Sequence, residues 1–165
     1  MKISAVDLVL RVSAKSIGAS EVPVGSNAGP YVERVLGVTK LGKGYPWCAA
    51  EVADTGVIAL GALWPLPRTA SCHALYEWAH KEGAIEAKPE RGDVFLVWYP
   101  SLGRFAHTGF VSEVGEPCFT HEGNTSSGKA KGSREGWLKA EKRRVFSPRD
   151  RFIRWTRLLP AGFAA

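Results

Sequence analysis

The spacing of apolar residues changes near residue 90, and this change constrains the fold more than any other feature. Before it, apolar residues recur at helical spacing. After it, short apolar runs bounded by turn residues follow one another with no helical segment between them. Consecutive strands of this kind pair antiparallel, because parallel pairing needs a long crossover. The sequence therefore predicts an α+β fold, with N-terminal helices packed on a C-terminal antiparallel β-sheet.

The expected elements follow from caps, turns and apolar runs. Ser4 followed by Asp7 resembles a capping box at the start of the first helix. Helices are expected over 4–17, 30–36, 47–60 and 71–81, where the third begins at Trp47 or Cys48. Strands are expected over 94–99, 107–114, 118–122, 143–146 and 152–158, and the polar segment 123–136 is expected to be a mobile loop.

The length of 165 residues predicts one domain over 1–165. No apolar run approaches the roughly 18 residues that a membrane span needs. Asp7 and Arg11 interrupt the apolar N-terminus, so we expect no signal peptide.

Positive charge is concentrated near the C-terminus. Residues 129–157 contain eleven Lys or Arg against three Asp or Glu, a local net charge of +8 in a chain of net +6. Such a segment is typical of a surface for an anionic partner, or simply of a solvated face. The lysines expected on this surface are Lys129, Lys131, Lys139 and Lys142.

Cys48 is the candidate nucleophile. The three cysteines, Cys48, Cys72 and Cys118, are too few for a disulfide scaffold and form no CxxC pair. Cys48 stands where a helix should begin, and a helix N-terminus lowers the pKa of a thiol. The alternative is that Cys48 is a small apolar residue of the core.

A cysteine hydrolase also needs a histidine base. His73 and His80 lie seven residues apart on an expected helix, where they can be a surface or packing feature. His107 opens an expected strand directly after a loop, which puts its ring at a sheet end near a cleft. His121 would face away from Glu122 and Asn124, which share one face of a strand because they are two residues apart.

The segments "PWCAAEV", "RGDVFLVW", "AHTGFV" and "HEGNTS" together resemble the CHAP family of cysteine, histidine-dependent amidohydrolases/peptidases. The resemblance extends from "EVPVGSNAGPYV" to "RFIRWTRL" and is best to single-domain bacteriophage endolysins. It implies a papain-like fold, with Cys48 as nucleophile and His107 as general base. Glu122 and Asn124 match the residues that orient the histidine. The region "EVPVGSNAGP" lacks the aspartates of the family's calcium loop, so no metal or other cofactor is implied.

The resemblance also implies the substrate and the setting. Family members cleave peptidoglycan, either at the N-acetylmuramoyl-L-alanine bond or within the stem peptide or cross-bridge. We expect no separate cell-wall-binding domain, synthesis in the host cytoplasm, action on the wall after release, and a monomer. Trp47 and Trp98 can wall the cleft or belong to the core. The basic C-terminal third can add contact with an anionic envelope surface.

Two other functions remain open from the residues alone. A zinc amidase would use some of the four histidines and the cysteines, although no HExxH or standard ligand spacing is present. A non-enzymatic module would bind envelope polymer or nucleic acid through the basic segment, but no nucleic-acid motif accompanies that charge, and we expect no nucleic-acid partner.

Overall fold

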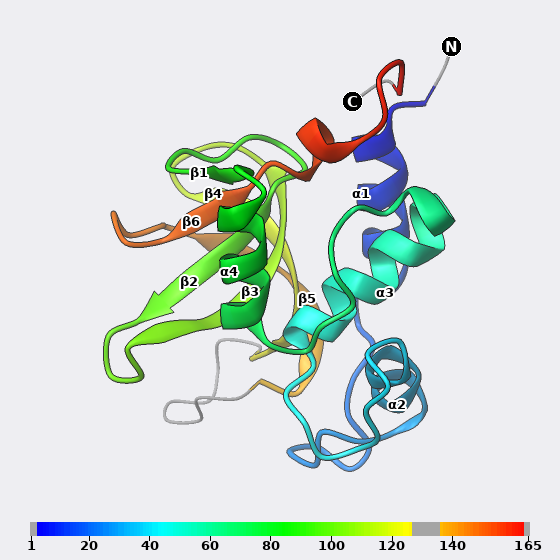
Figure 1. Cartoon of the computed structure of the whole chain (residues 1–165). Helices are drawn as coiled ribbons and strands as arrows, with labels where there is room; N and C mark the ends of the chain where they lie inside the picture. Colours follow the sequence, from blue (N-terminus) through cyan, green and yellow to red (C-terminus); the bar gives the residue numbers. More distant parts are fainter. Residues whose placement is uncertain (1–2, 127–135, 164–165) are drawn as a thin grey trace.

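The computed structural model describes residues 3–126 and 136–163, and it combines helices with one antiparallel sheet (Figure 1). The helices are α1 (Ala5–Lys15), α2 (Pro30–Gly37), α3 (Cys48–Leu60) and α4 (Cys72–Lys81), with 3-10 helices η1 (Gly61–Leu63) and η2 (Trp155–Leu158). The strands are β1 (Ile85–Glu86), β2 (Val94–Tyr99), β3 (Arg104–Glu113), β4 (Cys118–Thr125), β5 (Leu138–Arg144) and β6 (Arg151–Ile153). The predicted α+β class is confirmed.

The strands form one sheet in the order β1-β6-β2-β3-β4-β5, and all its pairs are antiparallel. Strand β6 returns from the end of the chain to lie between β1 and β2. Strands β3 and β4 are neighbours, so residues far apart in the sequence meet across them. His107 lies on β3 and Glu122 on β4.

The helices cover one face of the sheet. Helix α1 packs on α3, while α3 and α4 pack on β3, as Figure 1 also shows. The main core lies between them and includes Val9, Val52 and Phe110. Strand β4 approaches α3 closely, since a Cβ at Gly123 would lie 2.8 Å from the Trp47 ring. This close packing fixes the start of α3 against the sheet.

Helix α1 begins as predicted, because the Ser4 hydroxyl accepts a hydrogen bond from the Asp7 N–H at 3.0 Å. The last predicted strands differ from the structure. Strand β5 begins at Leu138, before the predicted start at residue 143, and the predicted strand over 152–158 ends at Ile153 and continues as η2. Charge-rich β5 is held by pairing with β4, which apolar patterning does not reveal.

The polar segment expected to be mobile begins as part of β4, which continues to Thr125. Its residues 127–135 lie outside the described part of the chain. Among the helices that the structure describes, none combines the length and apolar character needed to cross a membrane.

Candidate active site

Cys48 is the first residue of α3, so its thiol lies at a helix N-terminus. Trp47 occupies the N-cap and provides no side-chain hydrogen bond to the first turn. The partial positive charge of the helix end therefore stabilises a thiolate. Hydrogen bonds with Cys72 and His107 hold the pKa of the thiol well below its ordinary value, although burial opposes this.

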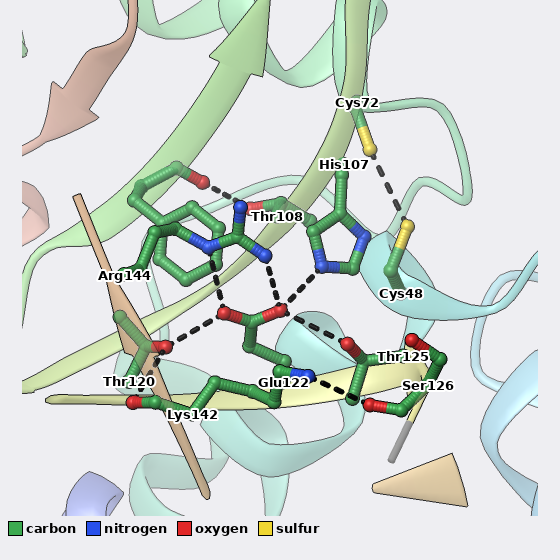
Figure 2. Close-up of polar contacts among 11 residues, drawn as sticks. Cys48, Cys72, His107, Thr108, Thr120, Glu122, Thr125, Ser126, Lys142 and Arg144 are labelled. Atoms are coloured by element: carbon green, nitrogen blue, oxygen red, sulfur yellow. Dashed lines mark hydrogen bonds and ion pairs between the residues drawn. The ribbon is translucent and has the colours of Figure 1, made fainter. Parts of the chain in front are cut away.

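His107 on β3 connects the thiol to a carboxylate. Its Nε2 lies 2.8 Å from Oε2 of Glu122, and Figure 2 shows the Cys48 sulfur on the other side of the ring. Burial alone would lower the pKa of His107, but hydrogen bonds and charge from Cys48 and Glu122 raise it to about 9. A low thiol pKa beside a high imidazole pKa favours a thiolate–imidazolium pair near neutral pH.

The Glu122 carboxylate is fully buried and held by four side chains, including His107 (Figure 2). Arg144 on β5 donates to it from Nε at 2.8 Å and from Nη2 at 2.7 Å, a bidentate pair. The hydroxyls of Thr120 and Thr125 donate to it at 2.6 and 3.2 Å. Burial raises the pKa of Glu122, yet hydrogen bonds with His107 and Arg144 lower it well below its usual range. The carboxylate is therefore ionised and fixed in orientation.

Asn124 lies in the same cleft as His107. Its φ is 51°, and the pairing of β4 with β5 is irregular between Glu122 and Thr125. The side chain lines a cavity together with His107, and its Oδ1 has no hydrogen-bond partner within the described residues. In this arrangement Glu122 orients the imidazole, while Asn124 keeps an unpaired amide oxygen beside it.

Cys72 is a site residue that the sequence reasoning missed. Its Sγ lies 3.6 Å from Sγ of Cys48, and it is the first residue of α4, just as Cys48 begins α3. The hydrogen bond with Cys48 raises the pKa of Cys72 well above its ordinary value, with burial acting in the same direction. The Cys72 thiol therefore donates to the Cys48 thiolate. Ser71, a good N-cap residue, was the sequence signal that a second thiol begins a helix.

The sequence analysis also missed Arg144, because it is one of eleven Lys or Arg residues in the basic segment 129–157. Nothing in the local sequence distinguishes it from Arg143, which is exposed and lies over the Phe119 ring. Only the pairing of β4 with β5 shows that Arg144 turns toward Glu122.

Cys48 lies at the boundary of two cavities. The larger, of about 480 Å³, extends along Cys72, and the smaller, of about 260 Å³, lies along His107 and Asn124. Arg104 lines both. An extended ligand can therefore lie across the thiol with one part in each cavity.

Neither tryptophan proposed for substrate binding lines these two cavities. Trp47 is fully buried and donates from Nε1 to Glu21 at 3.0 Å, so of the two alternatives that the sequence left open, the structure favours the core. Its ring instead anchors the loop before α3. Trp98 is half-buried and packs edge-on against Phe105, with ring centroids 5.2 Å apart. The aromatic residues that line the cavities are Tyr45, Tyr99 and Phe105.

None of the remaining histidines lines either cavity. His73 is 3.7 Å from Glu77 on the same helix, and His80 is exposed. His121 lies 3.6 Å from Glu141, and burial lowers its pKa. Within residues 3–126 and 136–163, no group of three or more His, Cys, Asp or Glu side chains is arranged to hold a metal ion.

Two of the lysines assigned to the basic surface are engaged by the protein itself. Lys139 is fully buried and ion-paired with Glu51 of α3, so its assignment as a surface charge is wrong. A buried ammonium needs such a partner to offset its desolvation. Lys142 donates to a backbone carbonyl at 2.7 Å. Lys129 and Lys131 lie outside the described residues.

No family model matches the chain, and no curated protein and no solved structure matches it either. The chemistry of the site therefore has to follow from its own residues and motifs.

Proposed function

We propose that this protein is a cysteine-dependent amidase or endopeptidase that hydrolyses an amide bond of bacterial peptidoglycan. One observation carries the proposal. His107 contacts both Cys48 and Glu122, and the Cys48 thiol lies between two cavities. A papain-like packing is part of the same proposal, since the nucleophile begins a helix and the base lies on the sheet that the helix packs against.

In the first half-reaction, the Cys48 thiolate attacks the carbonyl carbon of the scissile amide. Backbone N–H groups at the start of α3 stabilise the negative charge that develops on the carbonyl oxygen. His107 donates its proton to the nitrogen as the C–N bond breaks, which releases the amine and leaves a thioester. Glu122 accepts a hydrogen bond from the other ring nitrogen and stabilises the imidazolium.

In the second half-reaction, neutral His107 takes a proton from a water molecule, and the resulting hydroxide attacks the thioester carbonyl. The C–S bond breaks and the new carboxyl product leaves. Cys48 returns as a thiolate and His107 as an imidazolium, so one water molecule is consumed for each amide cleaved.

Peptidoglycan is supported as the substrate by the motifs that carry the site. "PWCAAEV" contains Cys48 and "AHTGFV" contains His107, and both resemble segments of single-domain bacteriophage endolysins. The bond is then either the N-acetylmuramoyl-L-alanine amide or one within the stem peptide or cross-bridge. The setting we propose is a lysin that acts on the host cell wall.

Clearing of a peptidoglycan suspension tests the proposal. Cys48→Ala should slow clearing by roughly a thousandfold or more, since it removes the nucleophile. Cys118→Ala is the matched control, because Cys118 is also buried but donates to the Gly115 carbonyl at 3.2 Å, with no other hydrogen bond among the described residues. Clearing by the Cys48 variant at a rate comparable to the wild type would overturn the mechanism. Mass spectrometry of the released fragments identifies the bond.

A further inference from the structure

The larger cavity beside Cys48 has positive charge that the described residues do not neutralise. Its walls include Arg68 and Arg104, both exposed. Within residues 3–126 and 136–163, neither guanidinium takes part in an ion pair or a side-chain hydrogen bond. No Asp or Glu is among the described residues that line the cavity. The cavity is therefore suited to an anionic group.

The rest of the wall suits a short peptide. Thr39 and Ser71 contribute hydroxyls, while Leu41 and Phe105 contribute apolar surface. A volume of about 480 Å³ falls within the range of sites that hold small organic ligands. The space therefore fits an amino-acid residue that has both an aliphatic part and a charge.

The position of His107 sets the direction in which a substrate lies. His107 must protonate the leaving amine, and it lines the smaller cavity together with Asn124. The amine part of the substrate therefore lies on that side. The acyl part, which becomes bonded to Cys48, extends into the larger cavity.

We propose that the larger cavity binds the acyl part of the substrate through a free carboxylate held between Arg68 and Arg104. This inference rests on the proposed function and narrows it. The scissile carbonyl then belongs to an acidic amino-acid residue of the stem peptide, whose second carboxyl group is free. The lactyl group of muramic acid does not fit, because its only carboxyl group forms the amide itself.

The test uses two soluble muropeptides that differ only in whether the carboxyl group nearest the scissile bond is free or is a carboxamide. The wild type should prefer the free acid by about tenfold or more in kcat/KM, because charge-assisted arginine–carboxylate bonds are strong. The double variant Arg68→Gln/Arg104→Gln should lose this preference, mainly through a higher KM. Arg143→Gln/Arg149→Gln is the charge-matched control, since both arginines are exposed and neither lines either cavity.

The outcomes separate this inference from the proposed function. Equal turnover of the two muropeptides, or a preference that survives the double variant, overturns the carboxylate site alone. Fragments cut between muramic acid and L-alanine also overturn it, while leaving the hydrolase intact. Failure of the wild type to cleave either muropeptide or whole peptidoglycan overturns the proposed function itself.

The contact between Cys48 and Cys72 carries a second, independent inference. Their sulfurs lie 3.6 Å apart, and both residues line the larger cavity, so a small oxidant can reach them. A disulfide needs the sulfurs at about 2.05 Å, so the two sulfurs would have to approach each other by about 1.5 Å. The geometry points to a reversible disulfide that switches the hydrolase off under peroxide.

The chemistry balances with hydrogen peroxide as the oxidant. The Cys48 thiolate attacks one peroxide oxygen and the O–O bond breaks, which converts Cys48 to a sulfenic acid and releases hydroxide. This hydroxide takes the proton of the His107 imidazolium and becomes water. The Cys72 sulfur then attacks the sulfenic sulfur and expels hydroxide, which takes the Cys72 proton. Two thiols and one peroxide become one disulfide and two water molecules, and a dithiol reductant reverses the bond.

Peroxide treatment followed by dithiothreitol tests this switch. The wild type should lose activity and recover nearly all of it, with a Cys48–Cys72 linked peptide in the oxidised sample. Cys72→Ser should recover much less, because unprotected sulfenic acid oxidises further to irreversible forms. Cys118→Ser should behave as the wild type. Absence of the linked peptide, or equal recovery by Cys72→Ser, overturns the switch.

Discussion

Replacing Glu122 by Gln should narrow the pH range of activity from its alkaline side. The active thiolate–imidazolium pair persists only below the pKa of His107, which is about 9 with the carboxylate 2.8 Å away. The glutamine side chain would keep the shape and an acceptor but remove the charge. An opposite charge this close shifts a pKa by roughly 1–3 units, so the alkaline limit should fall to between about 6 and 8.

The magnitude follows from the titration. With a pKa of about 9, roughly nine tenths of His107 is protonated at pH 8. A loss of about two units leaves roughly a tenth protonated, so kcat/KM at pH 8 should fall about tenfold. The variant loses activity as pH rises, because the pKa that falls belongs to His107 and the active form of His107 is the imidazolium cation. At pH 6 the variant should retain much more of the wild-type rate.

The assay is kcat/KM against pH on a soluble muropeptide, with folding checked by circular dichroism. Glu141→Gln is the matched control, because it removes a carboxylate beside His121 on the same sheet. Glu122→Gln/Arg144→Gln separates loss of the carboxylate from the effect of an orphaned guanidinium. An alkaline limit that stays near 9 in Glu122→Gln would refute the assigned role of the carboxylate.

Four further outcomes are expected. Cys72→Ala should move the acidic limit of Cys48 alkylation to higher pH, because it removes the hydrogen-bond donor that is the largest cause of the lowered thiol pKa; an unchanged limit contradicts this. Asn124→Ala should reduce kcat/KM less than loss of the Glu122 charge, and the reverse order would make the asparagine the principal orienting residue. Lys139→Met should lower the free energy of unfolding by about 3–5 kcal/mol in urea melts, since it leaves a buried carboxylate unpaired. EDTA should leave turnover intact while iodoacetamide abolishes it, and loss that zinc reverses would favour a metal amidase.

The sequence predicted the elements that have strong local signals. The capping box at Ser4 begins α1, and the strand predicted over 94–99 matches β2. The start of α3 at Cys48 also follows from local features, since Pro46 precedes it and apolar spacing continues after it. These signals depend on the neighbouring residues alone, so they can be read without knowing the fold.

Long-range pairing is what the sequence could not provide. Arg144 contacts Glu122 only because β5 pairs with β4, and Cys72 reaches Cys48 only because two helix N-termini converge. The sequence left open whether Trp47 walls the cleft or belongs to the core, and its ring in fact turns into the protein to meet Glu21. Each of these cases concerns the direction in which a side chain points, which depends on packing rather than on local pattern.

The buried ion pair of Glu51 and Lys139 is a further long-range contact that the sequence does not show, and it bears on the geometry of the site. Glu51 lies one helical turn after Cys48 on α3, and Lys139 lies on β5, the strand that also carries Arg144. Two charges taken out of water are retained only if they stay close together, so this pair restricts how α3 can shift along the sheet. Such a shift would separate the Cys48 sulfur from the His107 ring, whose other side is fixed through Glu122 and Arg144. A lysine that looks like surface charge in the sequence thus helps hold the Cys48 sulfur and the His107 ring, the proposed nucleophile and base, in register.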